Sequence, residues 1–367
     1  MKVGILGGGQ LAQMLAQAGQ ALDMEFMFLC PNEQACAAPL GQHLCFPFDD
    51  AAALDKMSRW SDVATFEFEN VPAEVVQSLA RHTRVYPPAV ALATAQDRLN
   101  EKQTFDRLDI PTPAYAAVDS LDDLRDAAAR LGLPAVLKTR REGYDGKGQA
   151  VLRDVADLAP AWERLGGVPM ILEAMVRFQR ELSIIAVRSP SDEVRYYPVS
   201  ENRHGDGILR LTLSRGDDPW QAPAEAYIDR LLHHLDYVGV LALELFQTED
   251  GLLANEIAPR VHNTGHWTIE GTACSQFENH LRAIAGLPLG DTGLRRPSAM
   301  VNLIGQLPSL QAIEQLPNAC AHIYGKEERP GRKLGHVTLT AGQNGFDAEF
   351  QQRLDRLTAL AAVEAAI

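Results

Sequence analysis

Two short apolar runs near the middle of the chain, residues 240–246 and 252–257, constrain its fold most strongly. The polar sequence Thr-Glu-Asp-Gly separates them, which is typical of a tight turn between antiparallel strands. A three-residue loop ending at Gly251, with left-handed backbone at that glycine, would place Glu244 opposite Glu256 on one face. The sequence therefore predicts a hairpin that carries two facing carboxylates.

These carboxylates suggest a metal site. Directly opposed residues have Cβ atoms about 4.5–5.5 Å apart, where like charges repel, so the pair needs a cation or must keep a proton. Mg²⁺, with Mn²⁺ as a substitute, fits best because it combines one or two carboxylates with water and substrate phosphates. A nucleotide is therefore expected beside the hairpin. The alternative is a pair of ordinary surface glutamates, against which the apolar neighbours on both strands argue.

Hydrogen-bond donors follow the second strand at once. Arg260, His262, Asn263 and His266 lie within the next ten residues and could hold an anion against the metal. A histidine just after a strand is more often structural than catalytic, so both interpretations stay open.

Composition narrows the class of protein. A chain of 367 residues is expected to form two or three domains. Its net charge of −14 argues against general affinity for nucleic acid or anionic membranes, so phosphorylated substrates need local basic clusters. Five cysteines without paired metal-ligand spacing predict reduced thiols in a cytoplasmic protein. The uncharged stretch 3–22 contains glycines and a stripe of glutamines, which a signal peptide or membrane span would not have.

The N-terminus reads as a βαβ unit, with strands at 2–6 and 26–30 around a helix at 10–22. Three glycines precede the helix, whose N-terminus is a ready anion site. The pattern Gly7-x-Gly9-x-x-Ala12 also fits a dinucleotide fingerprint, which makes an NAD-linked oxidoreductase the competing hypothesis. Against it, the second strand does not end in the acid expected to bind the ribose.

Further polar residues are expected at the end of a third strand, residues 63–68. Glu69 and Asn70 follow it, at the sheet edge where open α/β sheets bind ligands. A role as turn residues is an equal alternative. The prolines at 87 and 88 then break the chain before a helix predicted at 89–108, on which Arg98 and Lys102 share one face.

A glycine-rich loop, residues 143–149, follows the predicted strand 135–138, which ends in Lys138. It does not match the P-loop pattern, because glycine follows Lys147. We expect a flexible basic lid over a triphosphate, with a plain hairpin connection as the alternative. Apolar runs at 170–176 and 182–187 contain or adjoin single glutamates, as in a cleft that binds a base and its sugar. Four bases between 326 and 333 form the most basic short segment.

Four motifs together identify a family. They are GGGQLAQM (7–14), GYDGKGQ (143–149), NEIAPRVHNTGHW (255–267) and RPGRKLGH (329–336). In this order they resemble the N5-carboxyaminoimidazole ribonucleotide synthetases, which are ATP-grasp enzymes. The resemblance implies an α/β fold: a Rossmann-like N-terminal domain (1–97), a two-part ATP-grasp domain (98–295, with a mobile lid at about 135–180) and a small β-rich C-terminal domain (296–367).

The resemblance also implies an activity. In that family ATP, bicarbonate and 5-aminoimidazole ribonucleotide give the N5-carboxylated product through carboxyphosphate, with Mg²⁺ required, in purine biosynthesis. A cytoplasmic homodimer is expected. A sister ATP-grasp ligase using another acid is the nearest alternative, and a nucleotide sensor without catalysis is a third.

Site residues follow from the same resemblance. Those implied to bind ATP are Arg98, Lys138, Gly143, Tyr144, Asp145, Gly146, Lys147, Gly148, Gln149, Glu173, Ala174, Met175, Val176, Glu181, His204, Asn255 and Glu256. Glu244 and Glu256 would carry the metal, and Arg260 and His262 would hold bicarbonate. Those implied to face the ribonucleotide are Gln10, Leu11, Glu69, Asn70, Tyr144, Lys326, Arg332 and Lys333.

Overall fold

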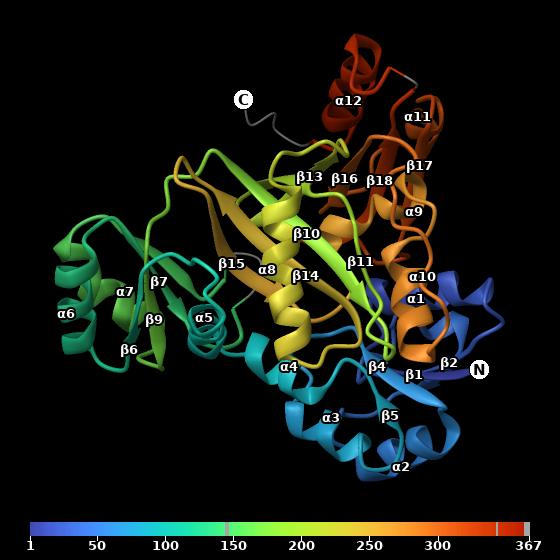
Figure 1. Ribbon diagram of the computed structural model, residues 1–367, viewed down its shortest axis with the longest axis horizontal. Coiled ribbons are helices and arrows are strands. Elements are labelled where there is room, and N and C mark those ends of the chain that lie inside the picture. Colours follow the sequence, from blue (N-terminus) through green and yellow to red (C-terminus); the bar gives the residue numbers. More distant parts are fainter. Residues whose placement is uncertain (144–146, 343, 363–367) are drawn as a thin grey trace.

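The computed structural model describes residues 1–143, 147–342 and 344–362. Its strands form three sheets in the described part of the chain, each with its own helices (Figure 1). The predicted site residues Tyr144, Asp145 and Gly146 lie outside the described residues.

The N-terminal sheet is parallel, in the order β3-β2-β1-β4-β5. Its elements are β1 (Lys2–Leu6), α1 (Gln10–Gln20), β2 (Glu25–Leu29), β3 (Gln42–Leu44), α2 (Ala51–Trp60), β4 (Val63–Phe66), α3 (Ala73–Leu79), β5 (Arg84–Val85) and α4 (Ala89–Ala95). The strand order reverses between β1 and β4, and ligands in such sheets bind at the carboxyl ends of the strands at this point. The triple-glycine turn after β1 lies there.

A second, antiparallel sheet forms a lobe at one end of the molecule, in the order β6-β9-β7-β8 (Figure 1). The elements of this segment are α5 (Arg98–Arg107), β6 (Tyr115–Val118), α6 (Leu121–Leu131), β7 (Ala135–Thr139), β8 (Gln149–Leu152), α7 (Leu158–Arg164) and β9 (Met170–Ala174). The glycine-rich loop joins β7 to β8, with Lys138 paired to Gln149. β7 and β8 are therefore antiparallel neighbours at the edge of this sheet.

The third sheet runs antiparallel in the order β15-β14-β10-β12-β13-β16-β18-β17, and β11 pairs with β10. Its segment contains β10 (Arg180–Arg188), β11 (Val194–Tyr196), β12 (Ser200–Gly205), β13 (Ile208–Ser214), α8 (Gln221–His234), β14 (Gly239–Gln247), β15 (Leu252–Ala258), α9 (Thr268–Gly271), α10 (Gln276–Ala285), β16 (Ser298–Ile304), α11 (Leu310–Glu314), β17 (Ala319–Ile323), β18 (Lys333–Thr340) and α12 (Ala348–Leu360). Pairing of β13 with β16 carries the sheet into the C-terminal region.

Both faces of β10 are covered, which explains its continuous apolar sequence. Leu182 and Ile184 face the cluster that contains Ile228 of α8. Ile185 on the opposite face belongs to the cluster that also holds Leu281 of α10 and the apolar side of α1. The helix pair α1 and α10 thus fastens the N-terminal sheet against the central one.

One sequence-based prediction of an element needs correction. The predicted helix at 89–108 is two helices, because Asp97 has extended backbone and caps α5 with its side chain. The helix α12 was not predicted.

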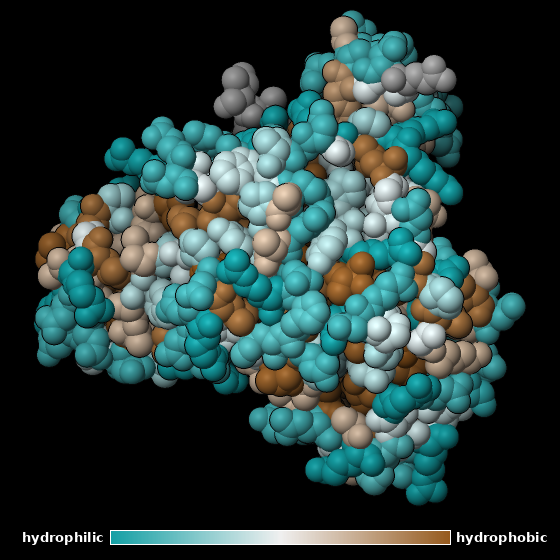
Figure 2. Space-filling view, viewed as in Figure 1, coloured by the Kyte–Doolittle hydropathy of each residue, from teal (hydrophilic) through white to brown (hydrophobic). Residues whose placement is uncertain are grey.

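The surface is mixed. Figure 2 shows hydrophilic side chains over most of one face, with apolar side chains as separate patches. Among the described residues, no helix is both long and apolar enough to cross a membrane. All five cysteines are free, as the sequence predicted.

Candidate active site

The hairpin β14–β15 has the predicted strands but a different turn. Gln247 pairs with Leu252, so four residues form the loop instead of three, although Gly251 has the expected positive φ of 140°. Leu243 nevertheless pairs with Ile257, as the predicted register requires, but the register shifts before Leu245, so Glu244 lies opposite the two residues Asn255 and Glu256.

A bulge in β15 reconciles these two registers. Leu243 pairs with Ile257 but Leu245 pairs with Ala254, so β15 contains one residue more than β14 between these pairs. Such bulges bend a strand and re-aim its side chains, and they are common next to active sites. Asn255, one of the residues expected to border the nucleotide, lies in this bulge.

The two glutamates are inequivalent. The Arg98 guanidinium donates to Glu256 Oε2 at 2.8 Å. Burial alone would raise the pKa of Glu256, but Arg98, then Lys138 and Lys102, outweigh it and lower that pKa. Burial and then the charge of Glu256 raise the pKa of Glu244 to about 7. An anionic Glu244 thus lacks sufficient compensating charge, which is the environment a divalent cation would relieve.

Two buried charges of α5 support the bulge, and the sequence interpretation missed this role. The Glu101 carboxylate accepts from the backbone N–H of Ile257 at 2.6 Å. Lys102 donates to the carbonyl oxygen of Asn255 at 2.8 Å. Both side chains are at most 2% exposed. Burial, followed by the charge of Glu256, raises the pKa of Glu101 to about 8. These contacts fix the backbone on both sides of Glu256.

Lys138 and Lys102 share one partner. Their ammonium groups lie 3.1 and 3.5 Å from Glu173 Oε2. Burial would raise the pKa of Glu173, but Lys138 and Lys102 together lower it. The Glu173 carboxylate is therefore buried against two lysines. The adjacent residues Ala174 and Met175 are more exposed.

The glycine-rich loop touches this cluster through Arg98, which also donates to the carbonyl oxygen of Gly143 at 3.4 Å. Gly148 has φ +70°, and a Cβ there would lie 2.6 Å from Thr139 Oγ1. Thr139 also donates its backbone N–H to Gly148 O at 2.8 Å. Only glycine meets both conditions without strain.

His204 of β12 and Glu181 of β10, two residues predicted to bind the nucleotide, form an ion pair. Burial would lower the pKa of His204, but the bond to Glu181 and the charge of Glu244 raise it. The nearby carboxylates thus favour the protonated form of this imidazole.

Arg260 and His262 lie where the central sheet meets the N-terminal domain. Arg260 pairs with Glu69 of the loop after β4 at 2.6 Å. His262 Nε2 is 3.6 Å from Glu244 Oε1, and Nδ1 is 2.9 Å from Thr264 Oγ1. Burial, then Arg260, lowers the pKa of His262 well below its usual range, so this imidazole is neutral at pH 7. Four predicted site residues, Glu69, Glu244, Arg260 and His262, therefore form two contacts.

The predicted ribonucleotide end also brings distant segments together. Lys326 donates to the side chain of Gln10 at the start of α1. Glu67 accepts from the backbone N–H of Gly9 at 2.8 Å in the same turn. Leu11 is 6% exposed and its side chain belongs to the apolar core, so its predicted role would fall to its backbone at the start of α1. Asn70 is exposed.

The rest of the basic segment adjoins this region. Arg332 and Lys333 lower the pKa of Lys326, after the larger effect of burial. Lys333 acts in the same direction on His262. The C-terminal bases are therefore close enough to influence both ends of the candidate site.

Family models match three successive parts of the chain. Residues 1–96 match a ribonucleotide synthetase preATP-grasp domain, residues 103–277 an ATP-grasp domain, and residues 298–346 a phosphoribosylaminoimidazole carboxylase C-terminal domain. The matches follow the order of the motifs that suggested the family.

Two N5-carboxyaminoimidazole ribonucleotide synthases match over more than nine tenths of the chain. The N5-carboxyaminoimidazole ribonucleotide synthase of Pseudomonas aeruginosa is 52% identical over 98% of this chain and 99% of its own. That of Brucella melitensis is 45% identical over 92% and 95%.

Solved structures agree. The synthetase of Thermus thermophilus has a TM-score of 0.92 and 49% identity, covering 98% of both chains. The Aspergillus clavatus enzyme, in complex with ADP and 5-aminoimidazole ribonucleotide, has a TM-score of 0.88 and 31% identity, also with 98% coverage of both. This chain belongs to the N5-carboxyaminoimidazole ribonucleotide synthase family of ATP-grasp enzymes.

Proposed function

We propose that the chain uses ATP and bicarbonate to carboxylate 5-aminoimidazole ribonucleotide on its exocyclic nitrogen, a step of purine biosynthesis. The observation that carries this proposal is a set of three contacts: Arg98 with Glu256, His262 with Glu244, and Arg260 with Glu69 of the N-terminal domain. Charged groups for a triphosphate and for a small anion then lie in one site.

Mg²⁺ is the divalent ion we propose, with Mn²⁺ as a substitute, held by Glu244 and Glu256. The fit rests on hard oxygen donors and on the raised pKa of Glu244, which burial and Glu256 cause. Bound there, the ion would neutralise charge on the ATP phosphates. Arg98 leaves one oxygen of Glu256 available, because it donates to the other.

The ATP phosphates would lie against Arg98, Lys138 and the loop of residues 143–149. Phosphoryl transfer depends chiefly on positioning and charge, which these cations supply. Glu181 and His204 would bind near the ribose, and residues 174–176 near the adenine. Closure of the loop would keep water from carboxyphosphate, which hydrolyses readily in an open site.

Bicarbonate would bind to Arg260, whose planar fork suits a planar oxyanion. A bicarbonate oxygen attacks the γ-phosphorus and ADP leaves, which gives carboxyphosphate. The amino nitrogen of the ribonucleotide then attacks the carboxyl carbon, inorganic phosphate leaves, and the nitrogen loses a proton. Neutral His262 is able to donate or accept a hydrogen bond beside Glu244.

The ribonucleotide would bind at the carboxyl ends of β1 and β4. Gln10, Glu69 and Asn70 would face it, with Lys326, Arg332 and Lys333 near its phosphate. The contact of Lys326 with Gln10 supports this placement, because it brings the basic segment to the N-terminus of α1.

We also propose a homodimer in the cytoplasm.

ATP consumption tests the activity, measured with the ribonucleotide present and bicarbonate removed or restored. Turnover that needs both substrates supports the proposal. Turnover driven by another acid would favour a sister ligase, and a change in nicotinamide absorbance would favour the oxidoreductase. Absence of any acid-stimulated ATP hydrolysis would favour a sensor.

A further inference from the structure

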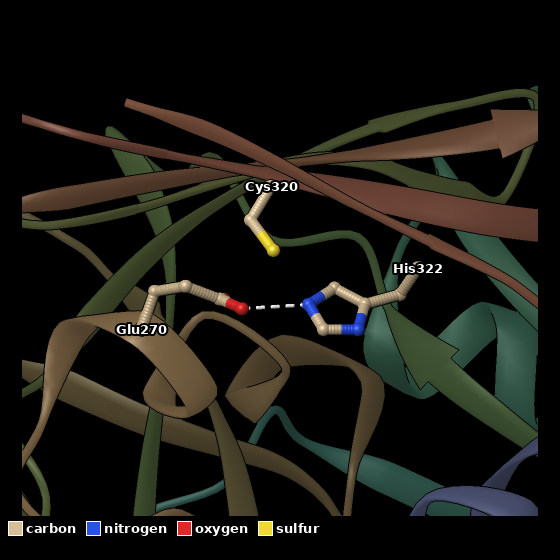
Figure 3. Close-up of side chains that lie close together, drawn as sticks. All are labelled: Glu270, Cys320 and His322. Atoms are coloured by element: carbon tan, nitrogen blue, oxygen red, sulfur yellow. Dashed lines mark hydrogen bonds and ion pairs between the residues drawn. The ribbon is translucent and has the colours of Figure 1, made fainter. Parts of the chain in front are cut away.

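A second group of metal-ligand side chains lies where α9 meets the edge strand β17 (Figure 3). Glu270 comes from α9, and Cys320 and His322 come from β17, two residues apart and hence on one face of the strand. Glu270 Oε1 is 2.6 Å from His322 Nε2, and the three candidate ligand atoms all lie within 4.8 Å of one another. The group is independent of the residues assigned to catalysis.

The donor types favour a zinc-class ion. A carboxylate oxygen, an imidazole nitrogen and a cysteine sulfur are the three kinds of ligand that bind Zn²⁺, at about 2.0–2.3 Å. Such bond lengths put tetrahedral ligand atoms about 3.3–3.8 Å apart. To bind the ion, the Glu270 oxygen and the His322 nitrogen would therefore have to move apart by less than about 1 Å, which side-chain rotation allows.

The surroundings fit an added ligand. Glu270 Oε2 is buried and has no hydrogen-bond partner among the described residues, an uncompensated position for a carboxylate oxygen. Cys320 is exposed, whereas Glu270 and His322 keep 18% and 23% of their side-chain surface accessible. An ion can therefore enter from solvent and keep a water molecule as its fourth ligand.

We propose that Glu270, Cys320 and His322 bind one zinc-class divalent ion, which fastens α9 to β17. The site would join the last part of the ATP-grasp segment to the C-terminal strand. It is chemically distinct from the Glu244–Glu256 pair, whose all-oxygen ligands suit Mg²⁺.

The site connects to the proposed ribonucleotide end through aromatic side chains. The ring of His322 stacks on that of His336 with centroids 4.5 Å apart. His336 Nδ1 shares a hydrogen bond of 2.7 Å with the hydroxyl of Tyr324. The ammonium of Lys326 lies 5.6 Å from the Tyr324 ring centroid. An ion that holds His322 would thus steady the strand that leads into the basic segment.

Titration of the full-length protein with Co²⁺, followed by competition with Zn²⁺, tests the proposal. Excess Mg²⁺ is present throughout to occupy the Glu244–Glu256 pair. We expect one Co²⁺ per chain with a thiolate-to-metal charge-transfer band, which Zn²⁺ removes. Zn²⁺ should also raise Tm, since an ion that binds only the folded state stabilises it.

Variants distinguish this site from others. Cys320→Ser should abolish the charge-transfer band, and His322→Gln should weaken binding by at least about 10-fold, the usual scale of losing a ligand interaction. Cys45→Ser is the matched control, because Cys45 is also an exposed free thiol, and it should leave the titration unchanged. Circular dichroism checks that each variant is folded.

Two results would overturn the proposal. One is the lack of a charge-transfer band in the parent protein. The other is a band that survives Cys320→Ser in a folded protein. Neither result depends on the carboxylation activity, so failure here leaves the proposed function standing.

Discussion

At the scale of single residues, one guanidinium makes two neighbouring carboxylates electrostatically different. Arg98 donates to Glu256 but not to Glu244, and their pKa values shift in opposite directions. Glu256 is thus held as an anion, while a further cation nearby would favour the ionised form of Glu244. The pair already has Arg98 as one cation, and it is suited to gain a second, a metal ion, together with the nucleotide.

Glu256→Gln should therefore cut turnover by at least about 10²-fold, because the phosphates lose their charge clamp while the fold stays intact. Steady-state kinetics and a melting curve measure the two effects. Activity within a few-fold of the parent would rule out the metal role.

Arg260 offers a second prediction at this scale. Arg260→Lys keeps the charge but loses the fork, so the KM for bicarbonate should rise at least about 10-fold while the KM for ATP changes little. The pair of Arg260 with Glu69 gives the competing structural explanation. If that pair is the whole role, Arg260→Lys and Glu69→Gln should both lower Tm and leave bicarbonate dependence unchanged.

At the scale of elements, the bulge of β15 places Glu256. Helix α5 supports the bulge through Glu101 and Lys102, each of which forms a hydrogen bond with a backbone group of β15. The chain begins this helix at Arg98, which itself reaches Glu256. One short helix therefore sets both the backbone and the charge of the metal-bearing strand.

Lys102→Met should lower the free energy of unfolding by about 3–5 kcal/mol, because Glu173 and two carbonyl oxygens lose a buried partner. Turnover should fall as well, since the bulge loosens. Urea denaturation and kcat are the measurements. Lys56→Met on the exposed side of α2 is the control, and an equal effect of both changes would contradict the role of Lys102.

The loop between β7 and β8 carries a further prediction. In Gly148→Ala a Cβ meets Thr139 Oγ1 at 2.6 Å, so kcat should fall more than ADP affinity. Gly132→Ala is a matched control, because Gly132 has φ +82° and no atom within 4 Å of the added Cβ. Equal losses of kcat and ADP affinity in Gly148→Ala would count against a lid.

The sequence predicted local elements better than their exact contacts. The register of Leu243 with Ile257 followed from alternation, but the extra residue at the bulge did not, since one turn sequence permits loops of several lengths. The sequence placed Lys102 only on the same helix face as Arg98, because the partners of Lys102 lie about 70 and 150 positions away. The family motif assigned Leu11 to the ribonucleotide site, although its spacing on α1 directs its side chain into the apolar core.

At the scale of the whole molecule, three regions close around one site. The Arg260–Glu69 pair joins the central sheet to the N-terminal domain, and Lys326 with Gln10 joins the C-terminal region to that domain. Packing of α1 against α10 supplies the apolar base for both contacts. Pairs this distant in sequence cannot be derived from local patterns, and only the family resemblance indicated them.

The contact of Lys326 gives the last prediction. Its ammonium reaches Gln10 from 316 positions away, at the helix N-terminus where an anion is favoured. Lys326→Gln removes the charge but keeps a hydrogen-bonding side chain, so the KM for the ribonucleotide should rise at least about 10-fold, as expected for a lost charge-assisted contact. The KM for ATP should stay near that of the parent, because the nucleotide cations lie on other elements. Arg329→Gln is the control, since Arg329 is an exposed base of the same segment. A purely structural role would lower Tm and leave both KM values alone, whereas equal rises in both KM values would place Lys326 in domain closure instead of substrate binding.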